Sequence, residues 1–541
     1  MVDLYEVYET ITRRLQREEE EKRQDPLVRI WDGNWKLFTE VQGYSALDFE
    51  FLKNDAGTAS FSIELTHPVA ELLMANEDWP TRSLYLTIDK DGARWSGRLV
   101  SCTVEEERTG KEELQVTFIH DYIKLKEILV WSNPFLPEGV QFPKAWFLYG
   151  PSKWVVATTL FVNLLRKNLS LWKVPDNPLD VLQWVDLDLS DWTMVVKPQS
   201  FRDDSSLTAA VTSRFKYFHD CVADVCHDAQ LSIEVRRYLE GDEPPIKGFK
   251  LRHGCLVVDV VDKSGWYRET AYFGTITRGL IRAIRRVTSD GLTEGLDYVQ
   301  NPNVPEPYKR PWWKGSLPEA PWVVLDDGPY TGIRSTHFEY APPGASQFVT
   351  GGSSMPGVNE AIKTSITAFV GMFGALFNQS QIGEIAANVT EPLWSDVFAA
   401  FQVWKDHQRI KEQGWDFPFE QWVDGSDKAY TLSSFMAVRA AKDATSESAS
   451  AIVKMENGAP YWVGPQGHGD FWIGDRVAIH AKGMTEDRLL VQHVESLKFE
   501  LDDKSNGWTI EIGQPQFTSG FDDLVRRYGA LTEGLRELGV W

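Results

Sequence analysis

Cysteine and basic residues are scarce in this sequence, and each shortage excludes a class of protein. Four cysteines among 541 residues cannot build a disulfide framework, so we expect the chain to fold in a reducing cytosol. Only 56 Lys and Arg stand against 78 Asp and Glu, and the net charge of −22 argues against a dedicated duplex-DNA binder with a basic face. A wall along which nucleic acid slides without binding remains compatible with this charge. Residues Met1–Glu6 lack the basic and apolar regions of a signal peptide, so none is expected.

The common catalytic and metal-binding motifs are also absent. The sequence contains no His-Glu-x-x-His, no Gly-x-x-x-x-Gly-Lys-Ser/Thr, no Gly-x-Ser-x-Gly and no Cys-x-x-Cys. Cys221 and Cys226 fall in a helical pattern in which they do not share a face well, so burial is their expected role. His219 and Asp220 are adjacent, and adjacent side chains on a helix point apart. We therefore predict no enzymatic activity, no cofactor and no metal site.

What the sequence does contain is a long region in which apolar and polar residues alternate. The clearest hairpin has turn residues at 54–57, with Leu47, Phe49 and Phe51 before the turn and Ala59, Phe61, Ile63 and Leu65 after it. This period of two predicts half-buried strands. Short strands with turn signals recur up to residue 130, so residues 25–130 are predicted to form a first small β-barrel domain after a charged helix over 1–24.

Beyond this domain, helical and β patterns alternate. The predicted parts are a mixed helical connecting region (131–227), the first part of a second β domain (228–300), a Pro- and Gly-rich irregular connection (301–358), a helical insertion (359–440), a β region that completes the second barrel (441–517) and an amphipathic helix (518–541). Individual helices are expected around 153–165, 207–227 and 391–411. The predicted fold is therefore mixed α+β and β-rich, with two related small barrels and helical insertions.

Residues 364–383 carry no charged side chain. An apolar stripe recurs there at helical spacing and consists of Ile366, Phe369, Val370, Phe373, Leu376 and Phe377. The plainer interpretation is a helix in a core or a subunit interface. The sharper one is a segment that plugs a channel or makes a transient contact with the host membrane. Lys363 and Glu384 bracket the stretch closely, so we reject a permanent membrane span.

Both ends of the sequence carry apolar stripes with heptad-like spacing. The stripe at the start consists of Leu4, Tyr8, Ile11 and Leu15, and the stripe at the end consists of Phe521, Leu524, Tyr528, Leu531, Leu535 and Leu538. A lone helix of this kind is marginal in water, so each stripe needs a surface to cover it. That surface belongs either to the chain's own domains or to a partner subunit.

Several short motifs, taken in their order, resemble the tail-hub or baseplate-hub proteins of long-tailed phages, especially phages that infect actinobacteria. The motifs are Leu47–Phe51, Gly57–Phe61, His67–Leu73, Trp95–Gly97, Asp427–Ser434, Ala459–Tyr461, Ile473–Arg476 and Asn506–Ile510. Proteins of this group are minor tail proteins, and the two barrels would then be of the tube type found in myophage baseplate hubs.

The resemblance implies a virion protein at the tail tip, assembled in the host cytoplasm. It implies a homotrimer whose two barrels per subunit form a pseudo-sixfold ring, with the distal tail protein, other tail-tip proteins and the tape measure protein as partners. Such a ring would join the tail tube to the tip, close or open the channel for DNA ejection and let DNA pass without specific binding. We expect more acidic than basic residues on its channel side. The alternatives are a tail-associated cell-wall hydrolase or peptidase and a carbohydrate-binding adhesion module, for which the 22 Trp residues could stack on sugars.

Overall fold

The computed structural model of the chain describes residues 24–74, 83–106, 112–133, 141–168, 189–204, 208–264, 283–287, 294–298, 323–326, 331–351, 401–417, 420–423, 448–480, 490–503 and 505–513, together with residues 5, 8, 9, 12, 13, 16, 136, 206, 316, 441 and 445. The chain forms two compact units. Unit 1 comprises residues 1–338, 450–515 and 530–541, and unit 2 comprises residues 339–449 and 516–529.

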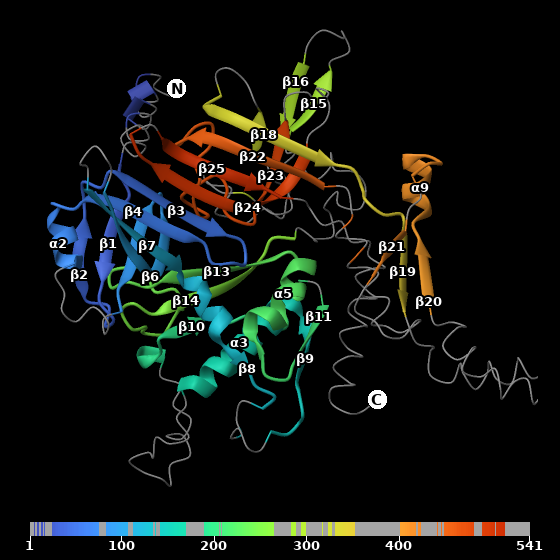
Figure 1. Cartoon of the computed structure of the whole chain (residues 1–541), viewed down its shortest axis with the longest axis horizontal. Coiled ribbons are helices and arrows are strands. Elements are labelled where there is room, and N and C mark those ends of the chain that lie inside the picture. The colour runs from blue at the N-terminus through green and yellow to red at the C-terminus, as the bar shows by residue number, and fades with distance from the viewer. Residues whose placement is uncertain are drawn as a thin grey trace, which may run out of the picture. The chain divides into compact units, whose positions relative to one another are not determined.

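The large sheet of unit 1 is built from strands near both ends of the sequence. Across the sheet, its strands are β18 (Ile333–Ala341), β22 (Ser448–Glu456), β25 (Asn506–Ile512), β24 (Leu490–Leu501), β3 (Ala46–Leu52), β4 (Thr58–Glu64), β7 (Glu112–His120), β6 (Ala93–Glu106), β5 (Tyr85–Lys90), β1 (Leu27–Trp31) and β2 (Leu37–Val41). β23 (Arg476–His480) pairs with β24, and β17 (Val324–Asp326) pairs with β23. In Figure 1 the blue N-terminal strands lie beside the orange and red C-terminal strands.

The alternating sequence pattern explains why these strands form. On β3 and β4, every second residue is buried, and the register pairs Phe49 with Ala59 as the predicted hairpin requires. The buried residues of the whole sheet form one apolar cluster, in which Phe49 contacts Phe499 and Trp508 with ring centroids 5.3 and 5.7 Å apart. Since β24 and β25 bring apolar residues to the same cluster, the C-terminal strands complete a core that the N-terminal strands begin.

A second layer of unit 1 contains helices. It comprises η2 (Asp121–Glu127), β8 (Leu129–Val130), β9 (Trp146–Pro151), α3 (Ser152–Asn168), η3 (Leu189–Asp191), β10 (Met194–Val196), β11 (Thr208–Ser213), β12 (Lys216–Tyr217), α5 (Phe218–Asp228), β13 (Leu231–Arg237) and β14 (Leu256–Asp262). β10, β14 and β13 form a three-stranded sheet against which α3 and α5 pack. This layer has its own apolar core. The predicted helix over 153–165 is thus confirmed as α3, which ends with Arg166 and Lys167, where positive charge suits the helix dipole.

Unit 2 has a small three-stranded sheet in its described part. β19 (Gln347–Gly351) lies between β20 (Phe401–Lys405) and β21 (Glu420–Trp422), and α9 (His407–Gln413) follows β20. Its buried cluster is minimal and consists of Ala345, Phe348 and Val423. The remaining elements are the helix α2 (Pro68–Met74) after β4 and the strands β15 (Ala283–Val287) and β16 (Glu294–Tyr298), which pair with each other.

Two predicted helices contain strands. The helix expected over 207–227 is wrong in its first half, where β11 pairs with β9 and only Phe218–Asp228 is helical. The helix expected over 391–411 is wrong at Phe401–Lys405, because this stretch pairs with β19. In both places β-branched or aromatic residues favour a strand once a neighbouring strand supplies hydrogen bonds. The stretch expected as an irregular connection, 301–358, likewise contains β17, β18 and β19.

The two predicted barrels stay a prediction. Among the described residues, β13 and β14 pair with β10, whereas the strands of 448–512 pair with β3, β18 and one another. The C-terminal strands therefore extend the sheet of the first β region and do not pair with the strands of 228–300. The charge-free stretch 364–383 and the C-terminal helix expected over 518–541 lie outside the described residues.

Candidate functional site

The side of the large sheet opposite its apolar core is a broad polar surface. Buried residues alternate with half-buried or exposed ones along β22, β25, β3, β4 and β7. The register places residues of β24 and β6 opposite the less buried ones, on the same side of the sheet. We call this surface, formed by these alternate residues of β22, β25, β24, β3, β4, β7 and β6, the polar sheet face. The register of each strand pair places the polar residues in rows across the strands.

The charged residues of the polar sheet face are mainly acidic. Its acidic residues are Asp48, Glu50, Glu64, Glu105, Glu113, Glu456, Glu500 and Glu511, and its basic residues are Arg98, Lys454 and Lys498. One row brings like charges together, because Glu113 on β7 lies opposite Glu64 on β4 and Glu105 on β6. Like charges directly opposite each other destabilise a sheet, so this row is not explained by fold stability.

Lys498 supplies the main compensation within this surface. Its ammonium lies 2.8 Å from Glu500, and Asp48 is opposite Glu500 in the register of β3 and β24. Burial alone would lower the pKa of Lys498, but the hydrogen bond to Glu500 and the charges of Glu500, Asp48 and Glu50 raise it above its usual value. The hydroxyl of Ser60 also donates to Asp48. One lysine thus balances only a small part of the negative charge.

A buried ion pair fixes the sheet to the second layer of unit 1. Both oxygens of Asp121, which follows β7, accept hydrogen bonds of 2.7 Å from Arg237 at the end of β13. The Ser96 hydroxyl donates to Asp121 at 2.7 Å, and the guanidinium of Arg237 lies 4.4 Å from the ring centre of Trp35. Burial alone would raise the pKa of Asp121, but the charge and hydrogen bonds of Arg237 hold it well below its usual range. The pair is therefore ionised and fully engaged.

Asn54 makes a second connection, at the tip of the β3–β4 hairpin. Its backbone φ is 54°, a left-handed conformation that Asn tolerates better than most residues. Its side-chain nitrogen donates to the Leu231 carbonyl at 2.8 Å, and its side-chain oxygen accepts from the Ile233 N–H at 2.8 Å. The amide thus pairs with the start of β13 as a neighbouring strand would.

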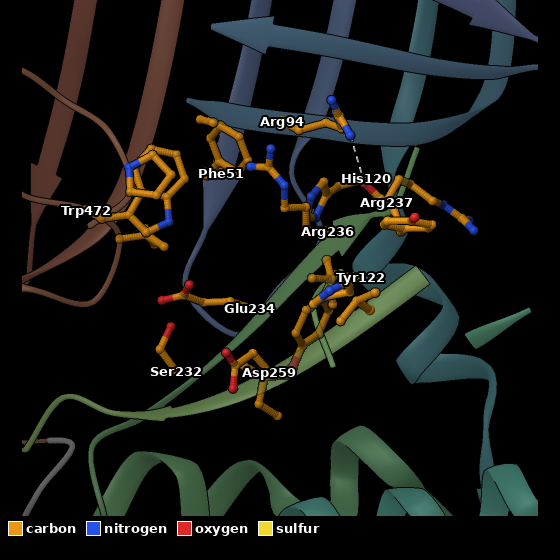
Figure 2. Close-up of a pocket in the computed structure, with 18 of the residues that line it drawn as sticks. Phe51, Arg94, His120, Tyr122, Ser232, Glu234, Arg236, Arg237, Asp259 and Trp472 are labelled. Carbon is orange, nitrogen blue, oxygen red and sulfur yellow. Dashed lines mark hydrogen bonds between the residues drawn. The ribbon is translucent and has the colours of Figure 1, made fainter. Parts of the chain in front are cut away.

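A cavity of about 260 Å³ lies between the large sheet and β13. Figure 2 shows Phe51 and Trp472 on one side of it, Glu234 and Asp259 on another, and Arg94 bonded to the backbone of Arg237, with a distance of 3.1 Å. Two acids in its wall form ion pairs: Asp259 lies 2.8 Å from Lys197, and Glu234 lies 3.5 Å from Lys263. Burial nevertheless raises the pKa of Glu234, although the charge of Lys263 opposes the shift.

His120, in the wall of this cavity, has a side chain without a hydrogen-bond partner. It is 5% exposed, and neither ring nitrogen has a hydrogen-bond partner. Its ring lies between Phe51 and Trp95, with centroid distances of 5.8 and 5.4 Å. Burial lowers the pKa of His120 to about 4, with Asp121 opposing the shift and Arg237 adding to it. The imidazole is therefore neutral at physiological pH.

Burial was expected for both cysteines of α5, but Cys221 is only half-buried. Cys226 is buried, and burial raises the pKa of its thiol to about 12. His219 lies 3.2 Å from the hydroxyl of Tyr122. No group of three or more His, Cys, Asp or Glu side chains suited to a metal ion occurs among the described residues. Within the described ranges, no helix has the length and hydropathy needed to cross a membrane.

Most of the predicted interaction residues fall outside the described part of the chain. This applies to Ile366, Phe369, Val370, Phe373, Leu376 and Phe377, to Leu4, Ile11 and Leu15, and to Phe521, Leu524, Tyr528, Leu531, Leu535 and Leu538. Tyr8 is described: it is helical and 66% exposed. Asp121 and Arg237 leave no signal in the sequence, because no local motif links two residues so far apart.

Comparison with known proteins assigns the chain to a family. It matches the family model described as Siphovirus ReqiPepy6 Gp37-like protein over residues 27–514. It is 35% identical to Minor tail protein Gp28 of Mycobacterium phage D29 over 547 residues, covering 92% of this chain and 91% of the relative. For Minor tail protein Gp28 of Mycobacterium phage L5, the identity is 33% over 560 residues, with 94% of each chain covered.

A solved structure that matches is the 43 kDa tail protein of prophage MuSo2 from Shewanella oneidensis, with a TM-score of 0.41 and 9% identity over 90% of this chain and 98% of the other. The family model spans both the large sheet and the helix-containing layer, and the two mycobacteriophage relatives extend over nearly the whole sequence. The chain therefore belongs to the Siphovirus ReqiPepy6 Gp37-like family of phage minor tail proteins.

Proposed function

We propose that three copies of this minor tail protein form the hub of the tail tip, and that the polar sheet face of each copy lines the channel through which DNA leaves. The observation that carries the proposal is the charge of this face. Acidic residues spread over β22, β25, β24, β3, β4, β7 and β6 with few basic residues among them. Such a wall repels phosphates, so DNA can pass without being held.

The rigid support behind this face fits the same role. A channel wall must keep its shape while a charged polymer moves along it. The aromatic cluster of Phe49, Phe499 and Trp508 packs behind the face, and the bonds from Asp121 and Asn54 tie the sheet to the second layer. Partners in this proposal are the distal tail protein, other tail-tip proteins and the tape measure protein, with assembly in the host cytoplasm.

The role we propose is structural and not enzymatic. The relatives are named minor tail proteins. Burial raises the pKa of the Cys226 thiol, which makes it a weak nucleophile, and Asp259 and Glu234 beside the cavity have lysine partners; both observations support a structural role. Zymography of the purified chain on host cell walls tests this directly, because a clearing zone would contradict it.

The charge-free stripe and the terminal stripes keep their proposed roles. Ile366–Phe377 from three copies would close the channel or contact the host membrane, and the terminal stripes would cover partner helices. A double variant with Phe369→Asp and Phe373→Asp is expected to block infection after adsorption, while particles still assemble. Wild-type infectivity of that variant would remove the stripe from the mechanism.

The main test reverses charge on the polar sheet face. We expect phage carrying Glu64→Lys, Glu113→Lys and Glu511→Lys to assemble and adsorb, but to release DNA at least severalfold more slowly, because the new lysines attract phosphates. Raising the salt concentration should restore the rate. The matched control reverses three exposed acids outside this face, with Asp224→Lys, Glu240→Lys and Asp503→Lys.

Two outcomes would overturn the proposal. One is a DNA release rate that is equal in the face variant and the control, measured with a fluorescent DNA-binding dye after triggering with purified receptor or host envelope. The other is a copy number in assembled tails that is not a multiple of three. Quantitative mass spectrometry of purified particles measures that number.

A further inference from the structure

Among the described residues, half of strand β6 has one edge without a partner strand. β6 runs for 14 residues, but its pairing with β5 covers only residues Ala93–Arg98. Residues Ser101–Glu106 pair with β7 on the other side, Val100 lies in a β-bulge, and no described strand pairs with the outer edge of this part. We call this part, Val100–Glu106, the free half of β6. Its outward N–H and C=O groups can form hydrogen bonds with another strand.

The side chains of this free half are unusually apolar for an unprotected edge. Val100 is 59% exposed and Val104 is 43% exposed. Edge strands that must stay unpaired are often protected by lysine or proline, and residues 100–106 contain neither. The β-bulge between Leu99 and Ser101 and the charges of Glu105 and Glu106 limit pairing only at the two ends of this edge.

The end of the free half is strongly acidic, and this defines the chemistry of its partner. Glu105 and Glu106 are exposed and lie opposite Glu113 and Glu112 on β7. A strand that adds to this edge therefore needs apolar residues for Val100 and Val104 and positive charge for the glutamates. A second β6 would bring more glutamate, so two free halves do not suit each other.

This chain contains a strand with the required composition. β15 has the sequence Ala-Ile-Arg-Arg-Val over 283–287, and the adjoining residues 278–282 contribute two more arginines. Among the described residues, β15 pairs only with β16, so its second edge has no described partner strand. Within one chain, β15 and β6 do not pair.

We propose that β15 of a second copy adds to the free half of β6, and that this β-sheet extension connects neighbouring copies in the proposed trimer. The inference rests on the proposed function. The contact joins two different surfaces, and a contact of this kind closes into a ring when each copy gives one strand and receives one. Backbone hydrogen bonds supply affinity, and the pairing of arginines with glutamates selects the partner.

Charge exchange tests the pairing. Glu105→Arg with Glu106→Arg should weaken self-association of the full chain at least tenfold, and Arg285→Glu with Arg286→Glu should do the same. The variant that carries all four substitutions should regain most of the wild-type association, because the charges are complementary again. The matched control, Glu240→Arg with Asp503→Arg, makes the same change in net charge at two exposed turn residues and should associate normally.

A second pair of variants probes the strand without reversing charge. Val104→Lys places a charged side chain on the free edge and should weaken association, whereas Ile452→Lys on the interior strand β22 should not. Association is measured by sedimentation velocity and native mass spectrometry at matched concentrations. Circular dichroism confirms that each variant is folded.

The outcomes separate this inference from the proposed hub. Normal association of the Glu105 and Glu106 variant, failure of the fourfold variant to recover, or a wild-type chain that stays monomeric in solution would each overturn the β6–β15 pairing. These results come from the isolated chain in solution, whereas the copy number in assembled tails and the DNA release rate of the Glu64, Glu113 and Glu511 variant test the hub. Both proposals are supported if assembled tails contain three copies, the twofold variants associate weakly and the fourfold variant associates normally again.

Discussion

Asp121 and Arg237 lie 116 residues apart in the sequence and form a two-point ion pair in which the side chains are 0% and 2% exposed. The pair joins the end of β7 to the end of β13, so it holds the large sheet against the helix-containing layer. A buried carboxylate that loses its partner stays charged in a poorly solvated place. This arrangement makes the pair a sensitive point of unit 1.

Arg237→Met is expected to lower the free energy of unfolding by about 3–5 kcal/mol, because Asp121 is left buried without its partner. Asp121→Asn should lower the free energy of unfolding by a similar amount. The double variant should lose clearly less unfolding free energy than the two single variants lose together, because neither member of the ion pair is left without its partner. Urea unfolding followed by tryptophan fluorescence measures all four proteins. Strict additivity would contradict the coupling.

Gly97→Ala should destabilise unit 1 by about 3 kcal/mol. A methyl group at Gly97 would lie 2.2 Å from the carbonyl oxygen of Ile119 on β7 and 2.5 Å from the ring of Trp95. The carbonyl belongs to a neighbouring strand and cannot move without breaking the pairing of β6 and β7. Gly33→Ala is the control, because its nearest neighbours would be 3.7 Å away. Equal melting temperatures for the two variants would contradict the prediction.

Stability should fall as the pH is lowered from about 6.5 to 4, in part because of His120. The pKa of His120 is about 4 in the folded chain, whereas an unfolded histidine titrates near 6.5. Between these values the unfolded state binds more protons, so acid favours unfolding by up to about 3 kcal/mol from this residue. His120→Phe should show a shallower loss of stability across this pH window. An unchanged slope would contradict the assignment.

Glu113→Gln should stabilise the chain by about 0.5 kcal/mol, because it removes repulsion from Glu64 and Glu105 on the two neighbouring strands. Glutamine can still accept the hydrogen bond of 3.1 Å from the Ser45 hydroxyl. The gain should shrink at high salt, which screens the repulsion. Thermal unfolding of Glu113→Gln at two salt concentrations measures this gain. As a control, Gln115→Glu adds a negative charge to the same strand and should lower the stability.

Local patterns in the sequence were enough to predict several elements of the large sheet. The alternation around Phe49 and Phe61 correctly predicts β3 and β4, and β24 lies within the region 441–517 that was predicted as β. These strands are half-buried in a sheet with one apolar face, and that arrangement leaves a period of two in the sequence. The helix α3 is found for the corresponding reason, with a period near 3.6.

Other elements could not be predicted from local pattern. β11 and β20 look helical in their sequence windows, and distant strands determine their conformation through hydrogen bonds. The acidic row of Glu64, Glu113 and Glu105 becomes visible only when three strands are placed in register. The pairing of Asp121 with Arg237 depends on how two layers pack, and sequence spacing carries no signal for it.

The side-by-side position of β3 and β24 also determines when the protein can mature. Lys53 after β3 bonds to Glu495 in β24 across 442 residues of sequence. At translation rates of 5–20 residues per second, β3 waits roughly 20–90 seconds on the ribosome for its neighbour. During this time one edge of β3 lacks its partner strand, and in a product truncated before β24 it stays without that partner. Only a chain translated as far as β24 has both edges of β3 paired.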